Sequence, residues 1–230
     1  GSNISGTGTC MVLNASNLTY TGAGNYITYG TSVQGNGIRA EGQSNITIKD
    51  LKIVKEGVDE ARNYGINFTS IVSSTVFNTT IFTNGTTNNW GIYLLRTNYS
   101  NFTSNNISTN GSSSSNRALY LDNSNGNNFT ANTMNPRGTY TSSGIYIDAS
   151  HNNTFVSNTI NTTSVGGNNE GVRFTGSSTY NNFTSNTIIT RGSATSNQGF
   201  ILASGSIQNI IVSNSINTSD TSTNNIGLKT

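Results

Sequence analysis

Apolar residues recur along this chain at intervals of 26 to 28 residues. Segments that open with glycine or alanine and continue with alternating apolar residues begin at positions 37, 65, 91, 118, 144, 171, 199 and 227. Seven such uniform intervals are the mark of a repeat architecture. Within each segment the second and fourth residues are apolar, as Ile92 and Leu94 are in GIYLL. This period-two alternation predicts a β-strand with one buried face.

Two further apolar columns complete each repeat. The second column is Ile46, Val76, Phe102, Phe129, Phe155, Phe183 and Ile211, and the third is Leu51, Ile81, Ile107, Met134, Ile160, Ile188 and Ile216. A unit with three short strands and no helix cannot bury its apolar face alone, so it must stack on its neighbours. We therefore predict an all-β solenoid of about 7–8 coils whose parallel strands lie about 4.8 Å apart.

The composition supports an all-β fold of this kind. The chain has 39 asparagines and one proline, and only 9% of its residues are charged. Asparagine, serine and threonine are poor in helix interiors, while threonine, isoleucine and aromatic residues favour strands. We assign residues 37–230 to the repeat domain and residues 1–36 to a degenerate first coil or cap that is continuous with it. Cys10 cannot form an internal disulfide and is expected to be a small buried hydrophobe.

Charge and hydropathy narrow the choice of partners. The net charge is +2 and there is no basic block, which argues against nucleic acid. No apolar run approaches the roughly 20 residues needed to span a bilayer. The charged segment 49–62 is interpreted as a solvated loop. We predict neither a metal site nor a cofactor, because one histidine, one cysteine and two methionines cannot build an ordinary copper or zinc site.

A column of asparagines follows the second apolar column by three residues. Its members are Asn105, Asn132, Asn158, Asn186 and Asn214. Asparagine tolerates the backbone of tight turns, and stacked amides can donate to and accept from one another. The column predicts an asparagine ladder at a buried corner of the solenoid.

The signature N-x-F-x-x-N-x-I, together with strands such as GIYL, resembles the repeats of the pectate-lyase-like superfamily. It is especially similar to the NosD-type (CASH) repeats of many exported archaeal and bacterial proteins. The resemblance covers residues 37–226 and implies a single-stranded right-handed parallel β-helix at an extracellular or cell-surface location. It leaves the activity open, because the superfamily includes lyases, hydrolases, epimerases, phage tailspikes, adhesins and proteins without known activity. The similarity to NosD carries no copper role.

The third and fifth residues of the first strand are expected to face solvent. Tyr93, Tyr120 and Tyr146 then form a row, with Arg39 and Arg173 in the same column. Because sugar-binding grooves of the superfamily commonly run along this sheet, these five residues are candidate contacts for a polysaccharide or envelope glycan. The alternative is that the rings stack on parallel strands and contribute packing without a ligand.

A possible catalytic set lies beside the tyrosines. Asp122 and Asp148 occupy one column in adjacent coils, and His151 and Arg173 follow. The set looks superficially similar to that of polygalacturonase-type enzymes, and two carboxylates about 5 Å apart would give an acid beside a base. The family's NTD, DD, GHG and RIK motifs are absent, and two acids are too few for a calcium site. The alternative is that both aspartates are solvated strand-edge residues and that His151 is a turn residue.

These patterns favour an exported structural or adhesive surface module that holds polysaccharide, and they favour it over an enzyme. The competing class is a polysaccharide hydrolase or lyase that uses Asp122, Asp148 and His151. Ice or mineral binding by the column Thr103, Thr130 and Thr184 ranks last, because Val156 and Val212 interrupt that column. The segment 227–230 begins another coil, so we expect end-to-end self-association or a place in a longer surface protein. Sequons at Asn45, Asn67, Asn101, Asn128 and Asn182 suit a secreted protein.

Overall fold

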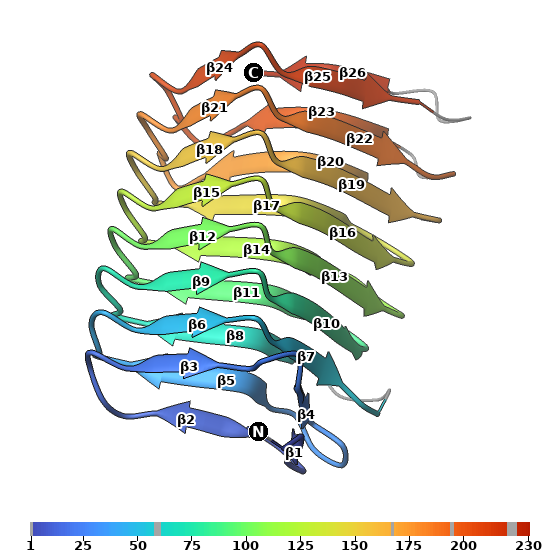
Figure 1. The fold of residues 1–230 in the computed structure, drawn as a ribbon. Coiled ribbons are helices and arrows are strands. Elements are labelled where there is room, and N and C mark those ends of the chain that lie inside the picture. The colour runs from blue at the N-terminus through green and yellow to red at the C-terminus, as the bar shows by residue number, and fades with distance from the viewer. Residues whose placement is uncertain (1, 58–60, 167, 194–195, 220–224) are drawn as a thin grey trace.

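The computed structural model describes residues 2–57, 61–166, 168–193, 196–219 and 225–230. In these residues the chain winds in a right-handed sense around one axis and builds three parallel sheets (Figure 1). Eight coils of three strands run from β2 to β25, with β1 before them and β26 after them. The predicted parallel β-solenoid with a repeat of one coil is therefore confirmed.

Sheet B contains the first strand of every coil and carries the candidate site. Its strands, in spatial order, are β2 (Met11–Leu13), β5 (Asn36–Glu41), β8 (Tyr64–Thr69), β11 (Trp90–Leu95), β14 (Asn116–Asp122), β17 (Ser142–Asp148), β20 (Asn168–Thr175), β23 (Ser196–Leu202) and β26 (Asn225–Lys229). Sheet C contains the short second strands. They are β3 (Thr19–Thr21), β6 (Thr47–Lys49), β9 (Thr75–Phe77), β12 (Asn101–Thr103), β15 (Asn128–Thr130), β18 (Thr154–Val156), β21 (Asn182–Thr184) and β24 (Ile210–Val212).

Sheet A contains the third strands. They are β1 (Ile4–Ser5), β4 (Tyr26–Tyr29), β7 (Lys52–Lys55), β10 (Thr80–Gly85), β13 (Asn106–Gly111), β16 (Thr133–Gly138), β19 (Thr159–Ser164), β22 (Thr187–Arg191) and β25 (Ser215–Thr218). The segment 1–36 supplies β2, β3 and β4, which pair with the three strands of the second coil. A capping role for this segment stays a prediction.

The apolar columns stack in register inside the solenoid. Phe102, Phe129, Phe155 and Phe183 are register partners in sheet C. Their rings lie parallel, with centroids 4.8, 4.7 and 4.2 Å apart between successive coils. This single pile of buried rings confirms the predicted winding, because only a constant repeat length brings equivalent side chains over one another.

Two members of the predicted apolar columns were assigned wrongly. Val76 has Ile48, not Ile46, as its register partner, and Ile81 pairs with Ile53, not Leu51. Ile46 and Leu51 are buried, but they lie at corners, where later coils carry serine, threonine or asparagine. An apolar residue at a corner and one in a strand look alike in the sequence, which is why the assignment failed.

The segment 49–62 is not the solvated loop that its charges suggested. Residues 52–55 form β7, Ile53 belongs to the core, and Lys55 is 2% exposed. The Lys55 ammonium donates to the carbonyl oxygens of Gly30, Glu56 and Gly57 at 2.6, 2.9 and 3.3 Å. Residues 58–60 lie outside the described part of the chain.

The predicted asparagine ladder is confirmed, and it is one of three. The predicted one, which we call the C–A ladder, lies between sheets C and A, with side-chain amide contacts of 2.9 to 3.0 Å. The B–C ladder consists of Asn127, Asn153, Asn181 and Asn209. The A–B ladder consists of Asn63, Asn89, Asn116, Asn169, Asn197 and Asn225, with Ser142 in register between its two halves.

An asparagine inside a ladder, such as Asn158, joins three coils. Asn158 Nδ2 donates to Phe129 O at 2.9 Å in the coil before and to Asn186 Oδ1 at 3.0 Å in the coil after. Its Oδ1 accepts from the backbone N–H and the side-chain amide of Asn132, at 2.9 and 3.0 Å. The buried amide is therefore fully paired, as a buried polar group must be to avoid a large desolvation cost.

One glycine column determines how sheets B and A pack. A Cβ on Gly37, Gly65, Gly91, Gly144, Gly171 or Gly199 would lie 2.1 to 2.5 Å from the Cγ2 atom of an isoleucine in sheet A. The exception in this column is Ala118, and the corresponding residue of sheet A is Met134. Methionine has no branch at Cβ, so this coil has room for the alanine methyl group.

Smaller features complete the description. Cys10 is partly exposed and packs against the core, and burial raises the pKa of its thiol. Thr103, Thr130 and Thr184 share a column on the outside of sheet C that Val156 and Val212 interrupt. The part of the chain that the structure describes contains no helix with the length and apolarity needed to cross a bilayer.

Candidate functional site

The outer face of sheet B carries a group of aromatic side chains that contact one another. Tyr93, Tyr120 and Tyr146 are register partners in three successive strands, as predicted. A second outward column contains Tyr64 and Trp90 in successive coils, followed by Arg117. We call these six residues the aromatic face. All six side chains are half-buried.

The sequence pattern missed the second column because the alternation changes phase at the glycine. Trp90 faces outward, Gly91 and Ile92 are both buried, and Tyr93 faces outward again. Strict alternation backward from Ile92 would instead turn Trp90 into the core. The signal that could have revealed this break is the invariant small residue itself, because two consecutive inward positions fit only where one lacks a bulky side chain.

The rings contact one another along the solenoid axis. Tyr64 and Trp90 stack with centroids 4.8 Å apart and an interplanar angle of 11°. Trp90 meets Tyr120 edge to face at 4.8 Å, and Tyr120 meets Tyr146 in the same way at 5.2 Å. Tyr93 lies 4.8 Å from Trp90 and 5.2 Å from Tyr120. The five rings thus form one continuous surface over four coils, with part of each ring exposed.

Arg117 lies within this surface as a cation without a carboxylate partner among the described residues. Its guanidinium carbon is 3.7 Å from the ring centroid of Tyr146, 4.6 Å from that of Tyr120 and 5.4 Å from that of Trp90. Burial lowers the pKa of Arg117. Contact with three ring faces supplies the favourable cation–π term that helps to offset this desolvation.

Two of the tyrosines are held in the protonated form. The Tyr93 hydroxyl donates to Asp122 Oδ2 at 3.1 Å. Burial, and then the charge of Asp122 together with this hydrogen bond, raises the pKa of Tyr93 well above its ordinary value. Burial and the Asp122 charge raise the pKa of Tyr120 in the same direction. Tyr93 and Tyr120 therefore present neutral phenols as hydrogen-bonding groups at physiological pH.

A buried carboxylate lies next to the aromatic face. Glu170 is 1% exposed; its Oε1 atom accepts from Arg173 Nη1 at 2.6 Å, and its Oε2 atom accepts from Ser143 Oγ at 2.8 Å. Burial lowers the pKa of Arg173, and the charge of Glu170 outweighs this effect, so the net shift is upward. Glu170 thus fixes Arg173, which was predicted both as a glycan contact and as a catalytic residue.

The four candidate catalytic residues have separate partners. Asp122 and Asp148 are register partners in adjacent coils. Asp122 accepts from Tyr93 and Asn123, and Asp148 accepts from Thr175 at 3.0 Å.

The remaining members of that set and Arg39 also bond elsewhere. His151 Nδ1 lies 2.9 Å from Thr179 Oγ1 and accepts from the Thr179 backbone N–H at 3.2 Å. Arg173 pairs with Glu170, as described above. Arg39, predicted to extend the tyrosine row, pairs with Glu41 at 2.6 Å, and Asn67 separates it from Tyr93.

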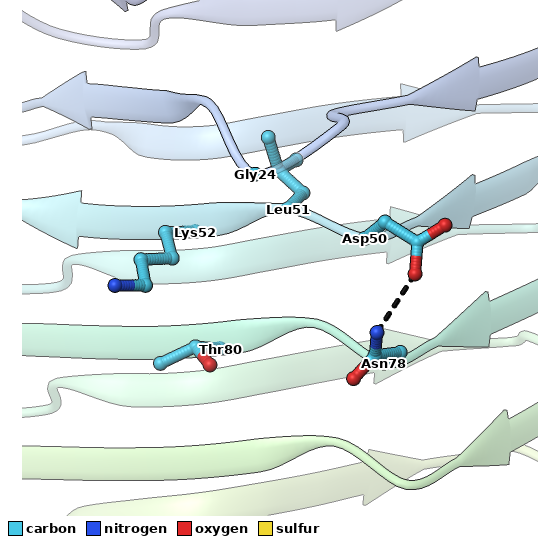
Figure 2. Close-up of a pocket in the computed structure, with 6 residues that line it drawn as sticks. All are labelled: Gly24, Asp50, Leu51, Lys52, Asn78 and Thr80. Carbon is cyan, nitrogen blue, oxygen red and sulfur yellow. Dashed lines mark hydrogen bonds between the residues drawn. The ribbon is translucent and has the colours of Figure 1, made fainter.

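No cluster in the described residues offers a metal site of three or more histidine, cysteine, aspartate or glutamate side chains. A shallow hollow does occur at the corner between sheets C and A, in the early coils (Figure 2). Its carboxylate, Asp50, accepts a hydrogen bond from Asn78 Nδ2 at 2.7 Å. The Lys52 side chain extends away from Asp50, so this hollow brings no reactive groups together.

Comparisons with known proteins add no family to this description. No protein-family model, no curated protein and no solved structure matches the chain.

Proposed function

We propose that this solenoid is an exported structural or adhesive surface module that holds a polysaccharide along the outer face of sheet B. The observation that carries the proposal is the aromatic face, in which five half-exposed rings and Arg117 form one surface over four coils. The resemblance of the repeats to those of the pectate-lyase-like superfamily and of NosD supports the same reading, including the surface location.

The chemistry of this face suits a sugar polymer. Tyrosine and tryptophan combine an apolar ring with a polar edge, and a sugar ring likewise combines C–H groups with hydroxyls. Packing among the rings and the stacked guanidinium fixes the contact atoms before a ligand arrives, which lowers the ordering cost of binding. Because equivalent contacts repeat from coil to coil, a polymer can engage several at once and gain avidity.

One observation favours a second candidate function. Asp122 and Asp148 are register partners at the edge of the same face, the arrangement that the hydrolase or lyase hypothesis requires. That hypothesis stays a prediction, and the assay below tests it together with binding.

The test is a panel of neutral and uronic polysaccharides, scored for binding and for release of new chain ends. Trp90→Ala combined with Tyr120→Ala should weaken binding at least tenfold, about 1.4 kcal/mol. Tyr99→Ala is the matched control, because Tyr99 is 67% exposed on a corner outside the aromatic face. It should leave the affinity unchanged.

Three outcomes would count against the proposal. Equal loss in the control and the double variant would show that the aromatic face is not the contact surface. Polymer cleavage that disappears in Asp122→Asn would replace the module by an enzyme. A folded protein that binds no polysaccharide in the panel would leave a scaffold without this function.

A further inference from the structure

The asparagines of this chain separate into an inward and an outward set with different sequence contexts. The three ladders contain fifteen asparagines, and none of them is followed two residues later by serine or threonine. The repeat itself explains this. Two residues after a ladder asparagine comes the second apolar column, the third apolar column or the small-residue column, as in Asn153–Phe155, Asn158–Ile160 and Asn89–Gly91.

Sixteen other asparagines open an N-x-S/T sequon, and none of them is buried. In a strand, an outward asparagine and the outward residue two positions later both face solvent. The sequons within strands of sheet C begin at Asn101, Asn128 and Asn182, and those within strands of sheet A begin at Asn84, Asn106, Asn110, Asn161 and Asn217. Seven more lie at corners or in the first coil.

Sheet B differs from the other two sheets in this respect. Its only sequon within a strand begins at Asn67 in β8, beside Tyr93 in the register. From β11 to β26 the described outer face of sheet B has none. The sheet that carries the aromatic face is thus the one that sequons leave almost bare.

We propose that the chain is N-glycosylated on sheets A and C and on the corners that border sheet C, which leaves the outer face of sheet B open for contact. In the transfer, the asparagine Nδ2 atom forms a bond to the anomeric carbon of an oligosaccharide. The lipid diphosphate that carried the sugar leaves, and the transferase takes the amide proton. The part of the proposal that concerns an open contact face rests on the proposed polysaccharide binding, whereas the modification itself does not.

Asn101, Asn106 and Asn152 are the strongest acceptors. All three are exposed, and no Nδ2 atom of theirs donates a hydrogen bond to another described residue. By contrast, Asn45 and Asn78 donate theirs to Asn17 and Asp50, at 2.9 and 2.7 Å. Asn152 also lies at a corner, with φ of +57°.

The ladder asparagines lack a sequon, so the sequence context protects them even in a chain that has not yet folded. A sugar on Asn158 would displace four buried hydrogen bonds and prevent coil stacking. The residue two positions after a ladder asparagine packs in the interior and is therefore neither serine nor threonine. The residues that build the core thus also prevent glycosylation of the ladders.

The test is mass spectrometry of the chain isolated from the cells that produce it, with enzymatic release of glycans to mark each site. We expect glycan on the peptides that contain Asn101, Asn106 and Asn152. Thr154→Val should abolish occupancy of Asn152 without touching that asparagine, and Asn123→Gln, at an exposed asparagine outside any sequon, should change nothing. Unmodified peptides at all three positions would overturn the proposal.

A second measurement tests the open face separately. Polysaccharide binding should change less than twofold when the glycans are removed, because the three expected sites lie outside the aromatic face. A gain of tenfold or more would show that they cover it, and would overturn this part. If the chain is glycosylated but binds no polysaccharide at all, the proposed function fails while the modification stands.

Discussion

The corner between sheets C and A is built in two ways in the same molecule. In the second coil it contains Leu51, which is 2% exposed, and in the sixth it contains Asn158, which is 1% exposed. Leucine at this corner needs only apolar neighbours, whereas asparagine needs partners in the coils before and after it. Two side chains with the same number of heavy atoms, both branched at Cγ but of opposite polarity, thus fill equivalent buried positions.

The coil before each corner explains the difference. In the first coil, the Asn25 backbone N–H donates to Gly22 O at 2.9 Å, within its own turn. The Asn25 N–H therefore needs no acceptor from residue 51. The Asn132 backbone N–H has no such partner within its coil and donates to Asn158 Oδ1 at 2.9 Å. In these two coils, the polarity of the corner residue follows from whether the preceding coil leaves its backbone amide unpaired.

The corner between sheets B and C changes from apolar to polar residues along the chain. Successive coils carry Leu18, Ile46, Ser74, Ser100 and Asn127. The Ile46 N–H donates to Ser74 Oγ at 2.9 Å, and the Ser100 N–H donates to Asn127 Oδ1 at 3.0 Å. Serine at this corner supplies an acceptor for the backbone N–H of the preceding coil. Asparagine supplies the same acceptor and adds a donor, as Asn127 Nδ2 donates to Thr97 O of the preceding coil.

The largest expected effect is at the ladder. Asn158→Ala leaves the Asn132 N–H and the Phe129 carbonyl unpaired in the interior, at about 1–3 kcal/mol each, so we expect a total loss of about 3–5 kcal/mol. Asn158→Leu should fail almost as badly, although leucine is native at position 51. Urea unfolding and hydrogen exchange of the Asn132 amide measure this. A stable Asn158→Leu variant would break the comparison.

The exposed column supplies the control for the ladder. Asn128→Ala removes a solvent-exposed amide contact to Asn101 of 3.1 Å, and should cost less than about 0.5 kcal/mol.

The next effect concerns the coil with Ala118. Met134→Ile restores a Cγ2 atom opposite the alanine methyl group and should destabilise the protein by about 1–3 kcal/mol through overpacking. Adding Ala118→Gly to Met134→Ile should recover most of the loss, because it recreates the pairing of the other coils. A double-mutant cycle measures the coupling, and additive effects of the two substitutions would contradict the packing account.

A smaller effect separates the first coil from the rest. Tyr29 is fully buried, and its hydroxyl has no hydrogen-bond partner among the described residues. Tyr29→Phe should therefore stabilise the protein by about 1 kcal/mol at pH 7.

That gain should grow in alkaline solution. Burial raises the pKa of Tyr29 well above its ordinary value, while the unfolded phenol ionises near pH 10. Below about pH 10 the Tyr29 phenol is protonated in both the folded and the unfolded state. As the pH rises further, only the unfolded phenol ionises, so the free energy of unfolding of the wild type falls. Thermal unfolding of both proteins across this range is the measurement, with Tyr99→Phe as the exposed control. If the unfolding temperatures of wild type and Tyr29→Phe fell in parallel above pH 10, ionisation of Tyr29 would be excluded as the cause.

The smallest effect is at a corner backbone. Ala131 has φ of +54° and is exposed, and a left-handed conformation is unfavourable for a residue with a Cβ atom. Ala131→Gly should stabilise by about 0.5 kcal/mol. Ala40→Gly, in the interior of β5, should destabilise by about 0.5–1 kcal/mol. If urea unfolding gave changes of the same sign in the free energy of unfolding for both substitutions, backbone strain at Ala131 would be excluded as the cause.

The winding of the chain could be predicted from the sequence, because a constant repeat length permits only one stacking of equivalent residues. Phe102, Phe129 and Phe155 stack as predicted, since any other period would scatter them. The early corners were misread because Ile46 and Leu51 are apolar at corners that later coils fill with polar residues; for Leu51, the reason lies in the hydrogen bonds of the preceding coil. Nothing in their own neighbourhood distinguishes them from core strand residues.

The candidate site was predicted only in part. Tyr93, Tyr120 and Tyr146 follow from alternation after the glycine. Tyr64, Trp90 and Arg117 precede it, where two consecutive buried residues reverse the phase, so strict alternation does not identify them as outward residues. The partners of Asp148 and His151 come from the following coil and depend on side-chain rotamers, which no repeat pattern specifies.

The ladders give the solenoid a direction. Asn132 offers its amides forward to Asn158, and Asn158 in turn to Asn186, so each coil leaves its open donors toward the C-terminus. During synthesis the N-terminal coil emerges first, and every coil laid down afterwards closes the donors of the one beneath it. Folding in that direction leaves only the donors of the newest coil unpaired, whereas folding from the C-terminal end would add each new coil against acceptors that are already in place.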